Sequence, residues 1–85
     1  MTLYQFRLLS PEVQLRFVLS EGAYLAMRWE GEFQSVNLYF LDDGGRGFFV
    51  EVGIDELAES IVVFRSFRSS VPLEDYTHGV GLPEG

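Results

Sequence analysis

Residues 36–52, VNLYFLDDGGRGFFVEV, decide the fold of this chain. Two apolar runs, in which large side chains recur at every second position, flank the glycine-rich segment DDGGRG at residues 42–47. Successive side chains of a β-strand point to opposite faces, so Val36, Leu38 and Phe40 form the inward set of the first run. The stretch therefore predicts two strands joined by a reversal of the chain.

The glycine-rich segment could instead be a binding loop. An EF-hand loop spreads its oxygen ligands over about twelve residues and ends in a bidentate acid, and that spacing is absent. A phosphate-binding loop needs Gly-Lys-Ser/Thr at the start of a helix, whereas Phe48 and Phe49 open a strand. Asp42 and Asp43 would also repel phosphate. Because glycine supplies the positive φ angles of a reversal, we interpret residues 42–47 as a turn.

Two further apolar runs flank this pair of strands. Leu25, Met27 and Trp29 form one apolar face of a strand, and a short reversal about Gly31 makes it a hairpin with the strand that follows. Beyond the turn, the large residues of the run share one face, and residues 61–67 again have strand character. The shared face of the run beyond the turn consists of Phe48, Val50, Val52 and Ile54.

One helix is predicted before the strands in the sequence and another after them. Ser10 can cap a helix from Pro11 to Glu21, and Gly22 can take the left-handed conformation that ends one. The apolar residues of this segment alternate as in a strand, but the caps favour the helix. A second set of capping and apolar residues predicts a short C-terminal helix, and residues 80–85 form a frayed tail. This set consists of Ser70, Pro72, Leu73, Tyr76 and Gly79.

The fold class is therefore α+β in a single domain spanning residues 1–85: an N-terminal helix, a four-stranded antiparallel β-meander and a short C-terminal helix. Connections this short favour antiparallel neighbours. The helices are expected to cover one face of the sheet and to leave the other partly solvated.

Composition restricts the function more than the motifs do. The chain has thirteen acids, six arginines, no lysine and no cysteine, and its net charge is −7. This charge disfavours nucleic acid and membrane surfaces and favours a basic protein partner. Without cysteine, and with His78 as the sole histidine, we expect no metal, no cofactor and no catalytic residue. The N-terminus lacks a secretory signal, so we expect a soluble, cytoplasmic protein of a bacterial kind.

The strand acid Glu51 has two interpretations. It shares a face with Phe49 and Gly53, where a solvated acid on an open sheet face is the favoured reading. The alternative is a polar anchor in a shallow pocket formed with Arg65 or Arg28 across the sheet. In FRSFRSS, residues 64–70, the arginines are expected to pair with acids while the phenylalanines pack, rather than to bind RNA.

The aromatic residues suggest a contact surface. If helices cover only one face, Tyr24, Tyr39 and Phe49 could stand on the other face beside the charged residues, as an interface or self-association surface. The predicted partner-binding residues are Tyr24, Arg28, Tyr39, Phe49, Glu51 and Arg65.

The chain also resembles a loosely defined group of small uncharacterised bacterial proteins. The resemblance lies in YQF at residues 4–6, in LYFLDD at 38–43 leading into FFVEVG at 48–53 with Asp55 soon after, and in FRSFRSS followed by Leu73 and Tyr76. It implies a compact hairpin-rich domain and assigns no activity and no functional residue.

Two functional hypotheses follow. The first is a non-enzymatic protein-interaction module, such as an acidic immunity- or inhibitor-type protein that binds a basic partner, with a homodimer through the aromatic face as a variant. The second is a small-ligand-binding domain that uses a pocket between sheet and helices, with Arg65 or Arg28 as its polar anchor.

Overall fold

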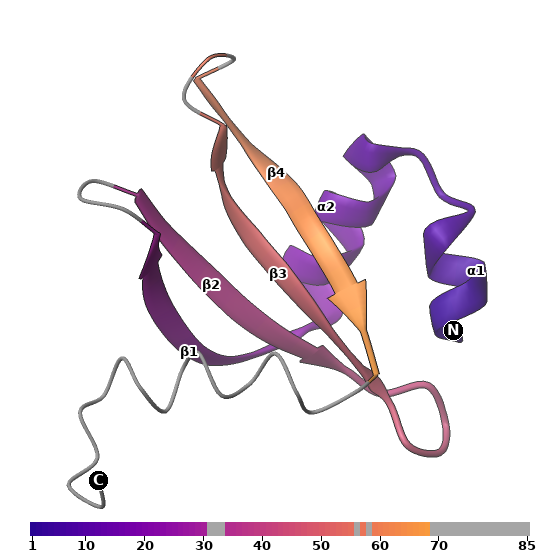
Figure 1. The fold of residues 1–85 in the computed structure, drawn as a ribbon. Helices are drawn as coiled ribbons and strands as arrows, with labels where there is room; N and C mark the ends of the chain where they lie inside the picture. Colours follow the sequence, from indigo (N-terminus) through magenta and orange to yellow (C-terminus); the bar gives the residue numbers. More distant parts are fainter. Residues whose placement is uncertain (31–33, 56, 58, 69–85) are drawn as a thin grey trace, which may run out of the picture.

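The computed structural model describes residues 1–30, 34–55, 57 and 59–68 of the chain (Figure 1). Two helices precede four strands that form one antiparallel sheet in the order β1-β2-β3-β4. This arrangement confirms the predicted α+β class and the four-stranded meander. The predicted C-terminal helix, the tail, His78 and the reversal about Gly31 lie outside the described residues. The elements are α1 (Leu3–Arg7), α2 (Pro11–Glu21), β1 (Ala23–Glu30), β2 (Gln34–Leu41), β3 (Phe48–Asp55) and β4 (Ser60–Phe67).

Helix α2 has the predicted bounds. The Ser10 hydroxyl accepts a hydrogen bond from the Val13 backbone N–H at 3.4 Å, and Pro11 occupies the first turn. The prediction for Gly22 was wrong, because its φ of −78° and ψ of 152° are extended rather than left-handed. Glycine is required there for another reason: a Cβ atom would lie 2.6 Å from the Val18 carbonyl oxygen, which accepts the Gly22 N–H.

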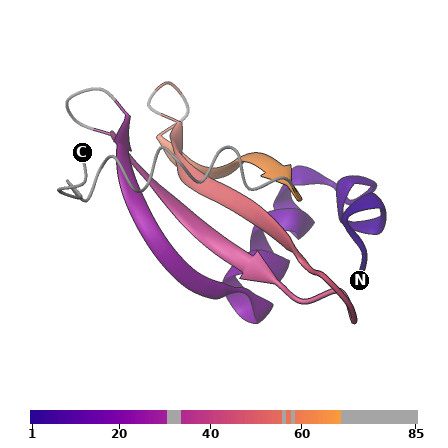
Figure 2. The same ribbon diagram turned by 60° about the horizontal axis from the view of Figure 1, so that its bottom comes forward.

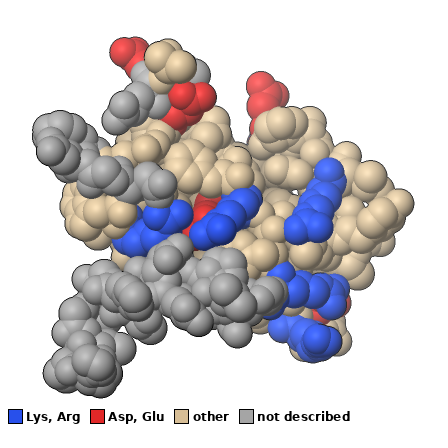
Figure 3. All heavy atoms as spheres, viewed as in Figure 1, with Lys and Arg blue, Asp and Glu red and all other residues tan. Residues whose placement is uncertain are grey.

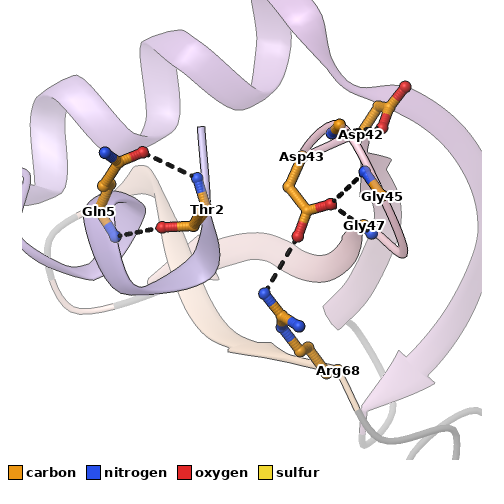
Figure 4. Close-up of polar contacts among 8 residues, drawn as sticks. Thr2, Gln5, Asp42, Asp43, Gly45, Gly47 and Arg68 are labelled. Atoms are coloured by element: carbon orange, nitrogen blue, oxygen red, sulfur yellow. Dashed lines mark hydrogen bonds and ion pairs between the residues drawn. The ribbon is translucent and has the colours of Figure 1, made fainter.

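Helix α1 is an element that the sequence analysis missed. Thr2 and Gln5 form a capping box, in which the Thr2 hydroxyl accepts from the Gln5 N–H at 3.1 Å (Figure 4). The Gln5 side chain in turn accepts from the Thr2 N–H at 3.0 Å. The Thr-x-x-Gln spacing was a readable signal for a helix start. Five residues are too few for a stable isolated helix, so α1 depends on burying Leu3 and Phe6.

The core lies between the helices and one face of the sheet, which we call the helix face. Both helices lie on that side, α1 beside β4 and α2 behind β3 and β4 (Figures 1 and 2). The Phe6 ring packs at 5.4 Å from Phe48 and 6.4 Å from Phe17, measured between centroids. Burial of these large apolar side chains supplies most of the folding free energy. The buried core cluster is Leu3, Phe6, Val18, Leu41, Phe48, Val50 and Val52.

The register places the inward sets of β2 and β3 on opposite faces of the sheet. Phe40 lies opposite Phe49, and Leu38 lies opposite Glu51, so the β2 set points away from the helices. The predicted set Val36, Leu38 and Phe40 is therefore the apolar side of what we call the second face. Val36 and Leu38 are nevertheless buried, so the second face is closed to solvent at these positions.

A β-bulge reshapes the second face next to these residues. The register between β3 and β4 shifts between Glu51 and Val52, which leaves Phe64 without a partner on β3. A Cβ atom at Gly53 would lie only 2.8 Å from the Phe64 ring. Gly53, which pairs with Val36 of β2, therefore leaves room for the Phe64 ring.

Candidate functional site

Four of the six predicted contact residues lie together on the second face. Arg28, Phe49, Glu51 and Arg65 come from β1, β3 and β4, and the strand register points all four side chains away from the helices. Arginine side chains spread across this face, with one acidic side chain between two of them (Figure 3). The structure thus brings four of the six predicted residues together on one face.

Glu51 is the centre of this group and is buried rather than solvated. Its exposed fraction is 0%, so the favoured reading of an outward solvated acid was wrong. Arg28 Nε donates to its carboxylate at 3.4 Å, Arg65 Nη2 donates at 3.2 Å, and Arg65 Nε makes a further close contact. Both arginines named in the alternative reading therefore hold Glu51. Two guanidinium groups offset the cost of desolvating the carboxylate.

A row of aromatic rings supports the ion pairs. Phe49 lies between Phe40 and Phe67, with centroid separations of 5.5 and 5.6 Å. The Arg65 guanidinium carbon stands 5.3 Å from the centroid of the Phe67 ring, within the range of a cation–π contact. These contacts fix Arg65 from two sides. The group forms a packed, charge-compensated cluster in which both carboxylate oxygens of Glu51 accept from guanidinium donors.

Tyr24 and Tyr39 lie on the opposite face, so the six predicted residues do not form one surface. They face each other across β1 and β2, with ring centroids 5.7 Å apart at 73°. Tyr39 pairs with Val50 of β3 and packs against the core on the helix face. The expectation that both tyrosines stand beside Arg28 and Glu51 was wrong, because side chains alternate along the strands.

The loop between β2 and β3 is closed by its own acid (Figure 4). One carboxylate oxygen of Asp43 accepts from the Gly45 N–H at 2.9 Å and from the Gly47 N–H at 2.8 Å, and Arg68 donates to the other oxygen at 3.0 Å. The hydrogen bond from Gly47, followed by that from Gly45 and the Arg68 charge, lowers the pKa of Asp43 below its ordinary value of 3.8. Backbone donors that could hold a phosphate are thus already used.

The loop is a reversal, as predicted. Leu41 pairs with Phe48 across its base, and Gly44 and Gly47 have φ angles of 89° and 81°. Gly47 is also sterically required, because a Cβ atom there would lie 2.2 Å from the Phe40 ring.

The structure exposes a surface that the sequence analysis missed. Six large apolar side chains, five on the half of the helix face that α1 and α2 leave uncovered and one on α2 beside it, are each at least 40% exposed. Trp29, the single tryptophan of the chain, is 63% exposed. We call this surface the open patch. The open patch consists of Leu19, Tyr24, Met27, Trp29, Ile54 and Ile61.

Strand β2 forms the floor of the open patch beside β1. Trp29 lies opposite Ser35, and Met27 lies opposite Asn37, so small polar residues form the floor beside large β1 side chains. A hollow of about 140 Å³ opens over this floor between α2 and the sheet. A volume of this order accommodates one large apolar side chain. Its lining residues are Leu19, Ser35, Asn37, Tyr39, Val52, Gly53, Ile54 and Ile61.

The sequence pattern predicted Leu25, Met27 and Trp29 as the buried face of a strand. Leu25 is instead the unpaired residue of a register shift between Tyr24 and Ala26. Met27 and Trp29 do point to the helix face, but neither α1 nor α2 lies over them. The signal that could have found the patch is a size argument: one helix about 10 Å across covers about two strands spaced 4.8 Å apart, not four.

No protein-family model, curated protein or solved structure matches the chain. Among the described residues, no three histidine, cysteine or acidic side chains gather as a metal site would require. No helix in the described ranges has the length and apolar character needed to cross a bilayer. The site must therefore be judged on its own geometry.

Proposed function

We propose that this chain is a non-enzymatic protein-interaction module that binds its partner through the open patch. The observation that carries the proposal is the exposure of six large apolar side chains on one contiguous half of the helix face. Soluble proteins rarely leave a continuous apolar surface uncovered unless it binds something. Tryptophan and tyrosine, both present here, are enriched among the residues that dominate binding energy.

The hollow supports protein binding in particular. Interfaces concentrate their energy where an apolar side chain of one partner fills a pocket of the other. The hollow of about 140 Å³ has the size for one such anchor, and its lining residues Ser35 and Asn37 lie opposite Trp29 and Met27 in the strand register. The hollow is only partly enclosed, which suits one protruding side chain of a protein better than a small metabolite that must be surrounded on most sides.

The alternative of a small-ligand domain with an arginine anchor has less support. The residues lining the hollow include neither Arg28 nor Arg65. Both guanidinium groups lie on the second face, where they contact Glu51. Among the residues that line the hollow, Ser35, Asn37 and Tyr39 carry polar side-chain atoms and none carries a charge. The charge that the alternative assigned to the ligand site is therefore on the other side of the sheet.

Affinity capture with matched variants tests the proposal. The wild-type chain, Trp29→Ser and the control Leu8→Ser are used as baits in a lysate of the cell that encodes the chain, at low and high salt. Leu8 is an exposed apolar residue outside the patch. We expect one captured protein, identified by mass spectrometry, to be lost with Trp29→Ser and retained with Leu8→Ser. Capture of nothing at either salt level, or equal capture by both variants, overturns the proposal.

A further inference from the structure

The sheet has two edge strands, and the described residues cover the edge of one of them. Strand β4 has α1 beside it, and Arg7 donates from Nη2 to the Ser66 carbonyl oxygen at 2.6 Å and from Nε to the Ser66 hydroxyl at 3.2 Å. Strand β1 forms the other edge, and β2 is its only partner among the described strands. An edge strand offers a row of unpaired backbone N–H and C=O groups to another chain. The β1 edge is therefore the place where this sheet can accept a further strand.

The regular part of the β1 edge is the stretch of residues 26–30. This stretch pairs in unbroken antiparallel register with residues 34–38 of β2. The register shift just before it leaves Leu25 unpaired, and bulges of this kind twist an edge away from pairing. Backbone groups of alternate residues point to the two sides of a strand, so about two or three residues of the stretch direct both N–H and C=O outward. Only another extended backbone matches such a row of donors and acceptors.

The side chains that the structure describes on this stretch do not protect it from pairing. Native sheets blunt their edges with proline, with charged side chains or with bulges. Residues 26–29 contain no proline and one charged residue, Arg28. Arg28 points to the second face, where its Nε reaches across β2 to the Glu51 carboxylate of β3 at 3.4 Å, and its side chain is only 15% exposed. The charge is therefore drawn toward the middle of the sheet and away from the edge.

Two apolar side chains of the open patch border the same stretch. Met27 is 40% exposed and Trp29 is 63% exposed, and both point to the helix face, which neither α1 nor α2 covers there (Figure 1). On a strand added beside β1, the side chains directly opposite these two would have Cβ atoms about 4.5–5.5 Å from theirs. A segment with apolar residues at alternate positions would therefore cover Met27 and Trp29 while its backbone pairs with β1.

From this geometry we infer that the partner docks through an extended segment, which adds a fifth strand along residues 26–30 of β1. This inference rests on the proposed function and specifies how the open patch is bound. Backbone hydrogen bonds to β1 supply affinity, and apolar side chains packed on Met27 and Trp29 supply specificity. The hollow, whose lining residues Ser35 and Asn37 lie opposite Trp29 and Met27, stays open to an anchor from the same partner.

Two other occupants fit this edge less well. A helix laid on the open patch would cover Met27 and Trp29, but it would leave the edge of β1 to water because a helix pairs its backbone groups internally. A second copy of the chain would pair β1 with β1, and the antiparallel pairing that uses all of residues 26–30 is centred on residue 28. That pairing places the two Arg28 residues directly opposite each other, and like charges in this position destabilise a pair of strands.

Peptides with a modified backbone test the pairing directly. The probe is an uncharged peptide of about seven residues in which Val and Thr alternate, a pattern that favours a strand. Two variants carry backbone N-methyl groups, one on every Val and the other on every Thr. Because alternate residues pair on opposite sides of a strand, each variant loses its donors on one side only. Each peptide is titrated into the full chain, and two signals are followed: the emission of Trp29, the only tryptophan, and the hydrogen exchange of the backbone amides.

In the free chain, we expect alternate amides of residues 26–30 to exchange rapidly, because they point away from β2. The unmodified peptide should slow their exchange by at least about tenfold and shift the Trp29 emission to shorter wavelength. One methylated peptide should bind at least about tenfold more weakly than the other, since only one of them loses the donors that face β1. Met27→Ser, which keeps the tryptophan reporter, should weaken binding several-fold, whereas Leu8→Ser outside the patch should not.

Equal binding of the two methylated peptides, no binding of the unmodified peptide, or protection of β4 amides in place of those of β1 would overturn the inference. So would slow exchange of every amide of residues 26–30 in the free chain, because the edge would then already be paired within the chain or with a second copy. If capture from the lysate still depends on Trp29 in any of these cases, the interaction function stands and only the strand-addition mode is wrong. If capture also fails, the function itself is wrong.

Discussion

Glu51 in β3 lies directly opposite Arg65 in β4, and its fully buried carboxylate accepts hydrogen bonds from both Arg65 and Arg28. One acid thus ties together β1, β3 and β4, with β2 between the first two. Burying a carboxylate is costly unless it is paired. The cluster therefore favours the one strand register in which Glu51 meets both arginines. A slip of one residue would move Glu51 to the helix face, into the apolar core.

Substituting Glu51 by alanine should destabilise the fold strongly. The change removes the carboxylate from two guanidinium groups, and the Arg28 side chain is only 15% exposed. Breaking a buried pair by removing one partner costs about 3–5 kcal/mol. Urea unfolding followed by circular dichroism measures the loss.

Arg65→Gln is the matched test of the same cluster. The Arg65 side chain is 44% exposed, and Arg28 remains to pair with Glu51, so the loss should be smaller, about 1–3 kcal/mol. If Glu51→Ala costs less than Arg65→Gln, the carboxylate is not the buried centre of the cluster.

Asp43→Asn should change how the free energy of unfolding depends on pH. The hydrogen bonds from Gly47 and Gly45 and the nearby Arg68 lower the folded-state pKa of Asp43 below 3.8. A lowered folded pKa contributes stability that is fully present above the unfolded value and is lost as the pH falls through the folded value. The wild type should therefore be more stable than Asp43→Asn at neutral pH, and the difference should shrink below pH 3.8. Unfolding curves recorded across this range test the sign, and a constant difference would contradict it.

The two left-handed glycines of the β2–β3 loop should respond differently to alanine. At Gly44, with φ of 89°, a Cβ atom meets nothing within 4 Å, so only the backbone conformation is strained, at about 1–2 kcal/mol. At Gly47 the same strain is joined by a clash with the Phe40 ring at 2.2 Å. Overpacking adds about 1–3 kcal/mol, which makes Gly47→Ala the more damaging change by that amount. Equal losses in chemical unfolding would show that the loop relaxes around the added methyl group.

Local signals in the sequence were sufficient for most of the fold. Ser10 and Pro11 fixed the start of α2, and alternating side chains located β2 and β3, because caps and strand alternation depend on neighbouring residues alone. Helix α1 was missed although Thr2 and Gln5 have capping-box spacing, since so short a helix forms only when its apolar residues find the core.

The candidate site was harder to predict because it depends on register and on what covers each face. Alternation placed Glu51 beside Phe49 correctly, but the burial of its carboxylate follows from Arg65 and Arg28 meeting it across the sheet. Conversely, Trp29 has the pattern of a core residue and is exposed, because neither α1 nor α2 lies above β1. Sequence periodicity identifies an apolar face and does not say whether that face is covered.

Trp29→Ser should leave the stability of the isolated chain almost unchanged. Trp29 is 63% exposed, so its removal leaves little buried space, and substitutions at such positions usually change the free energy of unfolding by less than about 0.5–1 kcal/mol. Phe48→Ala provides the contrast: Phe48 is fully buried in the core, and emptying such a site costs about 3–5 kcal/mol. Urea unfolding followed by circular dichroism compares the two variants without a tryptophan signal. If Trp29→Ser costs as much as Phe48→Ala, the ring is part of the core in solution and the open patch is closed. If its cost is small, an exposed tryptophan that contributes nothing to folding is free to contribute to binding.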